Sequence, residues 1–280
     1  MGTINSILIA NRGEIAARII RTCKNMGIRS VAVFSDADRY APYLKDADLA
    51  VYIGASEPSA SYLDSERIIQ VAKEHGADAI HPGYGFLAEN ADFAKKVANS
   101  GMVFIGPNPK AIELMGSKSK AKEIMQKHKV PIVPGYQGDD QSLKTIEKEA
   151  KSMGYPVLLK AVAGGGGKGM RIVEKASELK SQLEGAKREA LSAFGNDDLI
   201  VERYFSSARH VEFQIFGDQH GNAIHVLERE CSIQRRYQKV IEESPSPVLD
   251  EKTRKAMGEA AVNAAKALKY DNAGTVEFIY

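Results

Sequence analysis

The first hundred residues alternate between short apolar runs and segments with helical spacing. Residues 6–10 (SILIA) and 30–34 (SVAVF) have the length and composition of buried strands, whereas residues 14–26 carry apolar side chains at helical spacing before Gly27. Strands that alternate with helices predict a parallel sheet with right-handed crossovers. The same pattern predicts a helix over residues 65–74 and strands over residues 78–81 and 101–105.

Two polar, glycine-containing motifs follow strands of this predicted sheet. ANRGE (residues 10–14) comes after the first strand, and HPGYGF (residues 81–86) comes after the strand at 78–81. Open parallel sheets bind their ligands at the carboxyl ends of the strands, so a ligand is expected near these motifs. Because ANRGE lacks the G-x-G-x-x-G spacing, the sequence disfavours a dinucleotide there.

The pattern changes after a lysine-rich helical stretch over residues 110–128. Residues 130–135 (VPIVPG) contain two prolines and a glycine, which end a helix and indicate a domain junction. Residues 210–216 and 223–230 alternate apolar and polar side chains on either side of GDQHGN, which predicts an antiparallel hairpin. The other elements expected in this half are helices over 142–153, between 173 and 199, and over 251–268, and strands over 156–162, 170–173, 199–203 and 274–280.

The composition is that of an ordinary globular protein. Hydrophobic residues make up 44% and charged residues 26% of the 280 residues, a length that suits about two domains. The 38 Lys and Arg nearly balance the 36 Asp and Glu, which disfavours a general nucleic-acid binder. Cys23 and Cys231 form no paired-cysteine motif, and no apolar run approaches the ~20 residues of a membrane span. We therefore expect a soluble cytoplasmic protein with neither nucleic-acid nor membrane partners.

Residues 161–171 read AVAGGGGKGMR and suggest a loop that closes over an anion. A Walker loop is excluded, because Lys168 is followed by Gly169 rather than by Ser or Thr. Strands on both sides predict a hairpin, and five glycines within six positions exceed what a plain turn needs. Glycine lets successive backbone N–H groups approach a phosphate, so the sequence predicts a mobile phosphate-binding lid, with a plain turn as the alternative.

Three charged residues have two interpretations each. Lys160 ends the apolar run PVLLK, so its ammonium group either reaches solvent or points at a ligand. Lys118, in MGSKSKAK, is either a solvated helix lysine or a phosphate contact. Glu277, in GTVEF, is either an outward-facing strand residue or a magnesium ligand, and the periodicity does not separate these alternatives.

Taken together, these segments resemble the ATP-grasp enzymes and, within them, biotin carboxylase. The matching stretches follow the family's order and run from near the first residue to the last, and QRRYQKVIEE after the glycine loop is highly specific. The stretches are IANRGEIAARI, IHPGYGFLAEN, FIGP, MGSKSKAK, GYPVLLKA, AGGGGKGMR, RHVEFQIF, ERECSIQRRYQKVIEESPSP and GTVEF.

The resemblance implies a fold of mixed α/β and α+β class. An N-terminal parallel α/β (pre-ATP-grasp) domain would occupy residues 1–109, followed by a connecting helix over 110–131. An ATP-grasp lid subdomain with the glycine-rich loop would span 132–204, and the start of the antiparallel ATP-grasp sheet would span 205–280.

The resemblance also implies an activity and its partners. The family converts ATP and bicarbonate into carboxyphosphate, with Mg²⁺ or Mn²⁺, and then carboxylates biotin on a carrier protein. It serves acetyl-CoA, propionyl-CoA, pyruvate and related carboxylases. Expected partners are therefore a biotin carboxyl carrier protein or domain, a carboxyltransferase subunit and, as in many members, a second copy of the chain.

The implied nucleotide site combines two lysines, the glycine loop, the ERYF segment and three later side chains. Tyr237 is a departure, since many members carry histidine or asparagine there, but its ring can still contact the nucleotide. The implied positions are Lys118 and Lys160 at the phosphates, Gly166 and Gly167 in the lid, Glu202, Arg203, Tyr204 and Phe205 at adenine, and His210, Gln234 and Tyr237 near the ribose and phosphates.

Three further positions carry over from the resemblance to the reaction itself. Lys239, in YQKV, would position bicarbonate and is the candidate catalytic residue. Glu277 would bind magnesium. Tyr84, in HPGYGF, would lie on the side that faces biotin.

The chain ends at Tyr280, three residues after Glu277. In the resembled family the next strand carries a second magnesium carboxylate and the groups that act on bicarbonate. We therefore expect the N-terminal portion of a longer working enzyme; the alternative is a non-catalytic nucleotide-binding or subunit-docking fragment. Other ATP-grasp ligases, such as carbamoyl-phosphate synthetase and D-alanine ligase, share the loop and metal chemistry, but QRRYQK and HPGYGFLAEN favour biotin.

Overall fold

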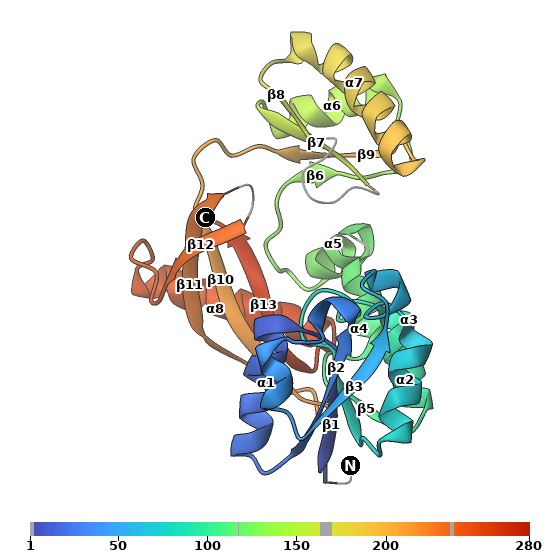
Figure 1. Ribbon diagram of the computed structural model, residues 1–280. Helices are drawn as coiled ribbons and strands as arrows, with labels where there is room; N and C mark the ends of the chain where they lie inside the picture. Colours follow the sequence, from blue (N-terminus) through green and yellow to red (C-terminus); the bar gives the residue numbers. More distant parts are fainter. Residues whose placement is uncertain (1–2, 117, 163–169, 236–237) are drawn as a thin grey trace. The chain divides into compact units, whose positions relative to one another are not determined.

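The computed structural model describes residues 3–116, 118–162, 170–235 and 238–280, without the side chains of residues 118 and 119 (Figure 1). None of the described helices combines the length and apolar character needed to cross a bilayer. The chain divides into two compact units. The first comprises Met1–Ser117, Phe216–Ala223 and Leu268–Ala273, and the second comprises Lys118–Ile215, Ile224–Ala267 and Gly274–Tyr280.

The first unit is built on a five-stranded sheet with the strand order β3-β2-β1-β4-β5. Every neighbouring pair in this sheet is parallel, so the parallel α/β fold predicted for this half is confirmed. The strands are β1 (Ser6–Ile9), β2 (Arg29–Ser35), β3 (Leu49–Gly54), β4 (Ala79–His81) and β5 (Val103–Phe104).

Strand β3 is missing from the predicted elements. It pairs with β2 at one edge of the sheet, and of its side chains only that of Ile53 is buried. Its sequence, LAVYIG, is nevertheless an apolar run of strand length. The sequence therefore indicates this strand, although the elements predicted above do not include it.

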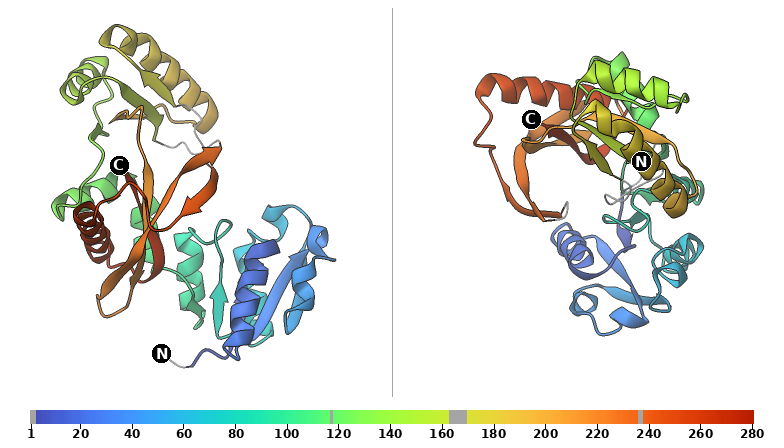
Figure 2. Two further views of the ribbon diagram at one scale, coloured as in Figure 1. Left: turned by 90° about the vertical axis from the view of Figure 1, so that its left-hand side faces the viewer. Right: turned by 90° about the horizontal axis from the view of Figure 1, so that it is seen from above.

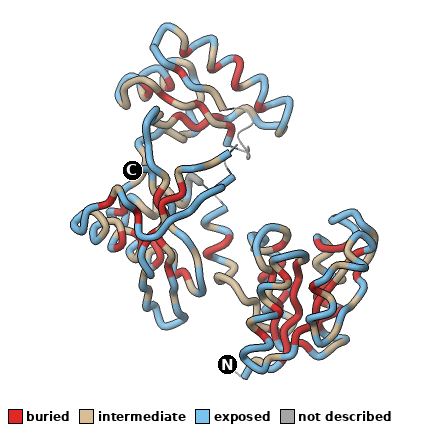
Figure 3. The backbone as a smooth tube through the Cα atoms, turned by 60° about the vertical axis from the view of Figure 1, so that its left-hand side comes forward, coloured by how far each residue is buried: buried red, intermediate tan, exposed pale blue. Residues whose placement is uncertain are grey.

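Helices cover both faces of the parallel sheet. Helix α1 (Gly13–Asn25) packs on one face through Ile20 and Cys23, while α2 (Ser65–Glu74) and α3 (Ala91–Asn99) pack on the other. Figure 3 shows the buried residues concentrated along the strands between these layers. Short 3-10 helices lie at Asp36–Asp38, Pro42–Lys45 and Pro58–Ala60.

A buried asparagine joins the two motifs at the carboxyl ends of β1 and β4. The side-chain amide of Asn11 donates to the backbone oxygens of Pro82 (2.8 Å) and Tyr84 (3.0 Å). Between these acceptors Gly83 adopts φ +65°, and a Cβ there would lie 2.7 Å from Nδ2 of Asn11. ANRGE and HPGYGF are therefore held together at the edge of the sheet where ligands are expected.

The lysine-rich stretch predicted as one helical segment forms two described helices. Helix α4 (Pro109–Gly116) belongs to the first unit and buries Ala111 and Ile112. Helix α5 (Lys118–Lys127) belongs to the second unit. The division between the units falls between these helices.

The second unit contains an antiparallel sheet of order β6-β9-β7-β8, with α6 and α7 on one face. Strands β7 and β8 pair on either side of the glycine run, so the predicted strands of that hairpin are confirmed. Residues 163–169, which include the lid positions Gly166 and Gly167, lie outside the described residues. The bounds are β6 (Gly135–Tyr136), α6 (Leu143–Met153), β7 (Val157–Ala161), β8 (Arg171–Val173), α7 (Ala176–Phe194) and β9 (Leu199–Arg203).

The remaining sheet has the order β12-β11-β10-β13, with α8 along one face (Figure 2). Strand β12 was not predicted, because its sequence, QKVIEE, does not alternate apolar and polar residues. In the structure every one of its side chains is exposed. Its place is fixed instead by antiparallel pairing with β11. The bounds are β10 (His210–Gly217), β11 (Ala223–Arg235), β12 (Gln238–Glu243), α8 (Glu251–Ala267) and β13 (Asn272–Ile279).

We expect Asn11→Ala to lower the free energy of unfolding by about 2 kcal/mol, because two backbone oxygens lose a buried donor. Urea unfolding followed by circular dichroism measures the change. Asn25→Ala, at the exposed end of α1, is the matched control and should stay within about 0.5 kcal/mol of the unmodified chain. Equal stabilities of the two variants would show that the Asn11 hydrogen bonds contribute nothing.

Candidate functional site

The polar face of the sheet β12-β11-β10-β13 carries a cluster of charged side chains. Alternation along β10 turns Val211, Phe213 and Ile215 into the core, while His210 and Glu212 lie on the opposite face. The apolar face is closed by ring contacts, including that of Phe213 with Phe278 at a centroid distance of 5.7 Å. The two-residue period of the strand therefore places apolar side chains in the core and polar side chains on the opposite face.

Glu212 is the centre of this polar face. Its side chain is only 4% exposed, and its carboxylate accepts hydrogen bonds from Nε of Arg229 (2.6 Å) and from the ammonium group of Lys239. Lys239 also donates to Oε1 of Glu277 at 2.9 Å. One buried anion thus fixes two cations, and one of those cations reaches the carboxylate of the edge strand β13.

The ionisation of this cluster follows from its contacts. Burial pushes the pKa of Glu212 upward, but hydrogen bonds from Lys239 and Arg229 outweigh it and leave the pKa below its ordinary value. Burial likewise opposes the charge on Lys239, yet hydrogen bonds to Glu212 and Glu277 raise the pKa of its ammonium group. At neutral pH the face therefore carries an ionised carboxylate beside a protonated lysine.

His210 and Gln234 form a second contact group on this face. The side-chain nitrogen of Gln234 lies 2.6 Å from Nδ1 of His210 and also donates to the backbone oxygen of Cys231. Nε2 of His210 lies 3.5 Å from Oε2 of Glu277, beyond good hydrogen-bonding distance. The imidazole is therefore oriented through Nδ1, while Nε2 faces the carboxylate of Glu277.

Three possible metal ligands lie close together among the described residues. Single ligand atoms of His210, Glu212 and Glu277 all fall within 4.8 Å of one another. Mg²⁺ prefers oxygen ligands and is commonly held by one or two carboxylates together with substrate phosphates. Glu212 already binds two cationic side chains, whereas Glu277 is 53% exposed. Among these three groups Glu277 is therefore the carboxylate that a metal ion could reach from solvent.

A second carboxylate with two ammonium partners lies on the sheet β6-β9-β7-β8. Lys160 and Glu202 lie on the face of this sheet opposite α6 and α7. The Glu202 carboxylate contacts Lys160 through Oε2 and Lys122, from α5, through Oε1. The sheet thus presents two ammonium groups on one nearly buried anion.

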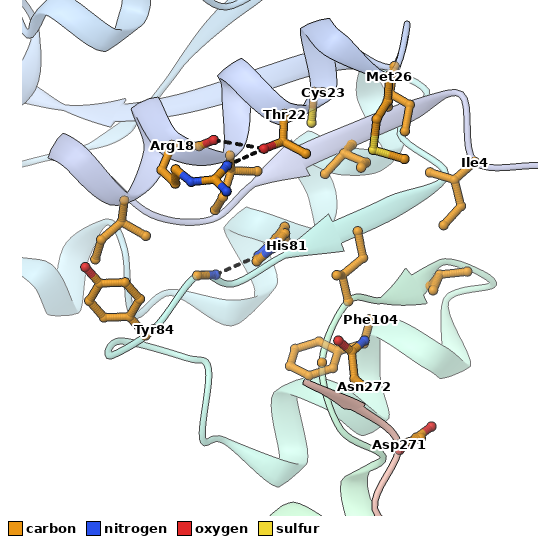
Figure 4. Close-up of a pocket in the computed structure, with 18 of the residues that line it drawn as sticks. Ile4, Arg18, Thr22, Cys23, Met26, His81, Tyr84, Phe104, Asp271 and Asn272 are labelled. Atoms are coloured by element: carbon orange, nitrogen blue, oxygen red, sulfur yellow. Dashed lines mark hydrogen bonds between the residues drawn. The ribbon is translucent and has the colours of Figure 1, made fainter. Parts of the chain in front are cut away.

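The first unit has a pocket of about 1070 Å³ beside α1, which extends from the start of β1 to the carboxyl end of β4 (Figure 4). Tyr84 lines it, and the Tyr84 hydroxyl donates to the carboxylate of Glu14. His81 lies deeper, where burial lowers its pKa and Nδ1 accepts the backbone N–H of Gly83 at 3.0 Å. The pocket therefore has polar groups near the carboxyl ends of β1 and β4, while α1 lines it with both apolar and polar side chains.

Comparison with known families covers nearly the whole chain. Residues 3–112 match the family described as biotin carboxylase, N-terminal domain. Residues 117–280 match the family described as carbamoyl-phosphate synthase L chain, ATP binding domain. The chain belongs to the biotin carboxylase family. The ATP-grasp resemblance and the mixed parallel and antiparallel fold are thereby confirmed.

Relatives with curated names agree with this biotin carboxylase assignment. The chain is 55% identical to the mitochondrial methylcrotonoyl-CoA carboxylase subunit alpha of Dictyostelium discoideum, over 99% of this chain and 40% of that protein. It is 52% identical to biotin carboxylase 1 of Bacillus subtilis (strain 168), over 99% of this chain and 62% of that protein. The chain thus spans between two fifths and two thirds of the length of these relatives.

Solved biotin carboxylase structures share the fold. The Campylobacter jejuni biotin carboxylase–beta-gamma-ATP complex superposes with a TM-score of 0.92 at 51% identity, over 99% of this chain and 62% of that one. The biotin carboxylase domain dimer of Hydrogenobacter thermophilus 2-oxoglutarate carboxylase, solved with MgADP, ADP and bicarbonate, gives a TM-score of 0.90 at 49% identity, over 100% and 61%.

The structure brings together part of the site predicted from the biotin carboxylase motifs. Lys239, His210, Gln234 and Glu277 lie in contact with one another or with shared partners on one sheet face. Tyr84 lies in the first unit. The side chain of Lys118, the lid residues Gly166 and Gly167, and Tyr237 lie outside the described residues.

The residues of the ERYF segment make different kinds of contact. The guanidinium group of Arg203 donates to the backbone oxygen of Met153 at 2.6 Å. The backbone N–H groups of Arg203 and Tyr204 donate to the oxygens of Pro134 and Pro156, so these two amides stabilise the fold. Phe205 is exposed and remains the candidate apolar contact for a base.

Sequence reasoning missed Lys122, Glu212 and Arg229. A signal for Glu212 existed, because it lies between Val211 and Phe213 in an otherwise apolar strand, where a carboxylate needs a partner. Arg229 and Lys122 gave no such signal. Each lies in a polar stretch, and only the tertiary structure brings it to a buried carboxylate.

We expect Glu212→Gln to lower the free energy of unfolding at pH 7 by about 2 kcal/mol, because Arg229 and Lys239 lose their shared anion. The folded-state pKa of Glu212 is depressed, so its ionised form stabilises the fold above its unfolded-state pKa. This contribution is lost as the pH falls through the folded-state pKa. The stability difference should therefore stay nearly constant from pH 7 to about pH 5 and shrink as the pH falls further, toward about pH 3.

Urea unfolding of both proteins across this pH range measures the difference. Glu251→Gln, at a position whose side chain is 98% exposed, is the control and should show almost no difference at any pH. A Glu212→Gln difference that stays constant from neutral to acid pH would contradict the ionised contact.

Proposed function

We propose that this chain supplies the ATP- and bicarbonate-binding part of a biotin carboxylase, which carboxylates biotin through carboxyphosphate. The observation that carries the proposal is the match to the Campylobacter jejuni biotin carboxylase–beta-gamma-ATP complex, at a TM-score of 0.92 and 51% identity. The Lys239, Glu212 and Glu277 cluster on the matched sheet supports it with the charges that the reaction requires.

Phosphoryl transfer depends mainly on positioning and charge neutralisation. In the proposed site Lys160, and Lys118 from the preceding helix, would contact the phosphates, with Gly166 and Gly167 closing over them. Glu277 would hold Mg²⁺ together with the phosphates, and the ion would neutralise their negative charge. Nε2 of His210 has no hydrogen-bond partner within the described part of the chain, which supports a role for that ring beside the nucleotide.

Bicarbonate is a weak nucleophile that must approach another anion. A cation beside it lowers the electrostatic cost of bringing the two together. Lys239 supports this role, because its contacts with Glu212 and Glu277 raise the pKa of its ammonium group and fix its position. In this proposal Glu212 acts through Lys239 as a positioning residue.

Adenine, the ribose and biotin complete the proposed contacts. Glu202 to Phe205 would contact adenine, with Arg203 and Tyr204 contributing mainly through backbone oxygens and Phe205 through its ring. Gln234 and Tyr237 would lie near the ribose and phosphates. Tyr84, in the pocket of the first unit, would face biotin.

The proposal includes domains, partners and a location. The domains would be 1–109, 110–131, 132–204 and 205–280, as the sequence suggests. A biotin carboxyl carrier protein, a carboxyltransferase and a second copy of the chain are the proposed partners, which the dimer and carboxylase names of relatives support. A cytoplasmic location stays a prediction, because the sequence identity to a mitochondrial relative (55%) is close to that to a bacterial relative (52%).

The test of this function is ADP release by the purified full-length enzyme to which this chain contributes, with ATP, magnesium, bicarbonate and free biotin. We expect release to depend on bicarbonate and to rise with biotin. Lys239→Met should lower that release at least ~100-fold, the scale of losing one preorganised charge, while ADP binding changes little. Lys266→Met, on the exposed surface of α8, is the matched control and should keep full turnover.

The unmodified protein also distinguishes the alternative function. ADP binding without any response to bicarbonate or biotin would contradict the carboxylase proposal and support a nucleotide-binding module. Full turnover in Lys239→Met would show that the bicarbonate role belongs to another residue.

A further inference from the structure

Glu202 is an anion shared by two lysines from different parts of the chain. Oε1 contacts Nζ of Lys122 in α5, and Oε2 contacts Nζ of Lys160 at the end of β7. The Glu202 side chain is 12% exposed, and the two lysine side chains are 20% and 29% exposed. The three groups therefore form one largely desolvated cluster with a formal charge of +1.

The close approach of Lys122 depends on a glycine. Gly135 in β6 pairs with Glu202 in β9. A Cβ at Gly135 would lie 3.2 Å from Nζ of Lys122, 3.1 Å from Cγ of Glu202 and 2.9 Å from the backbone oxygen of Val201. Any larger residue would crowd the lysine, so the fold leaves room for this second ammonium group.

The fold needs only one cation to compensate Glu202. Burial raises the pKa of Glu202, but hydrogen bonds from Lys122 and Lys160 outweigh it and lower the pKa, so the carboxylate stays ionised at neutral pH. An ionised, buried carboxylate binds whichever ammonium group is nearby. Without Lys122 that group would be Lys160 alone, and the cluster would have no net charge.

We propose that Lys122 is a positioning residue of the nucleotide site: it holds Glu202 so that Lys160 is free to bind the phosphates. The inference rests on the proposed function, which places the phosphates at Lys160. A phosphate competes with Glu202 for Lys160, and the outcome depends on how well Glu202 stays compensated when Lys160 leaves. Lys122 provides that compensation and keeps the net charge at this point positive.

This role predicts an effect confined to the phosphates. ADP has phosphates that need Lys160, whereas adenosine does not. Lys122→Met should therefore weaken ADP binding about tenfold, the scale of one charge-assisted hydrogen bond, and change adenosine binding less than about twofold. A lysine that only stabilised the fold would weaken both ligands alike or neither.

Isothermal titration of each purified variant with Mg-ADP and with adenosine measures these affinities. Lys127→Met is the matched control, since it removes an exposed lysine from the same helix and should bind ADP like the unmodified protein. Lys122→Arg keeps a cation for Glu202 and should retain ADP affinity within about threefold.

A double variant separates the charge from the fold. Lys122→Met combined with Glu202→Gln removes the anion that holds Lys160 and restores the +1 charge. Relative to its adenosine affinity, which reports any change at adenine, it should recover most of the ADP affinity lost in Lys122→Met. Because the amide needs no compensating cation, this variant also remains informative if Lys122→Met alone does not fold.

The outcomes test the role of Lys122 separately from the proposed function. An unmodified protein that binds neither ADP nor adenosine would overturn the proposed function. An unmodified protein that binds ADP, with Lys122→Met unchanged or with equal losses for both ligands, would overturn only the role of Lys122. Failure of the double variant to recover ADP affinity would likewise contradict competition between Glu202 and the phosphates.

Discussion

The buried carboxylate of Glu212 is the contact on which the polar face of the β10–β13 sheet depends. An ionised carboxylate that is almost completely removed from water must be compensated by cations and hydrogen bonds. Arg229 from β11 and Lys239 from β12 provide that compensation, and Lys239 links the cluster to Glu277 on β13. One anion therefore ties together side chains from all four strands of the sheet.

The same arrangement occurs on the sheet β6-β9-β7-β8. There Glu202 binds Lys122 and Lys160, so on each of these two sheets a largely buried glutamate contacts two cationic side chains. In each case the anion fixes lysine side chains that would otherwise move freely in solvent. Rigid, charged lysines suit a site that binds phosphate and bicarbonate, because the charge is already in place when the ligand arrives.

A third buried glutamate has a structural role instead. Glu228 in β11 binds Nε of Arg254 in α8 at 2.7 Å and accepts the backbone N–H of Ser246. Arg254 also donates to the backbone oxygens of Ser246 and Leu249, which fixes the segment between β12 and α8. Glu228 and Glu212 therefore differ in the groups that they bind. Glu228 binds an arginine and a backbone amide that stabilise the fold, whereas Glu212 binds Lys239 of the candidate site.

The sequence by itself determined the class of fold, the order of most elements and the family. Hydrophobic periodicity and the positions of glycine and proline are local properties, so β1, α1 and α2 could be predicted directly. The motifs predicted site roles for Lys160, Lys239 and Glu277. Only the tertiary structure decided that β12, with its exposed side chains, is a strand, because its partner β11 supplies the hydrogen bonds. The tertiary structure alone also brought Lys122 to Glu202 and Arg229 to Glu212. A buried charge pairs with a group that is close in space, and the spacing of residues along the chain does not give that distance.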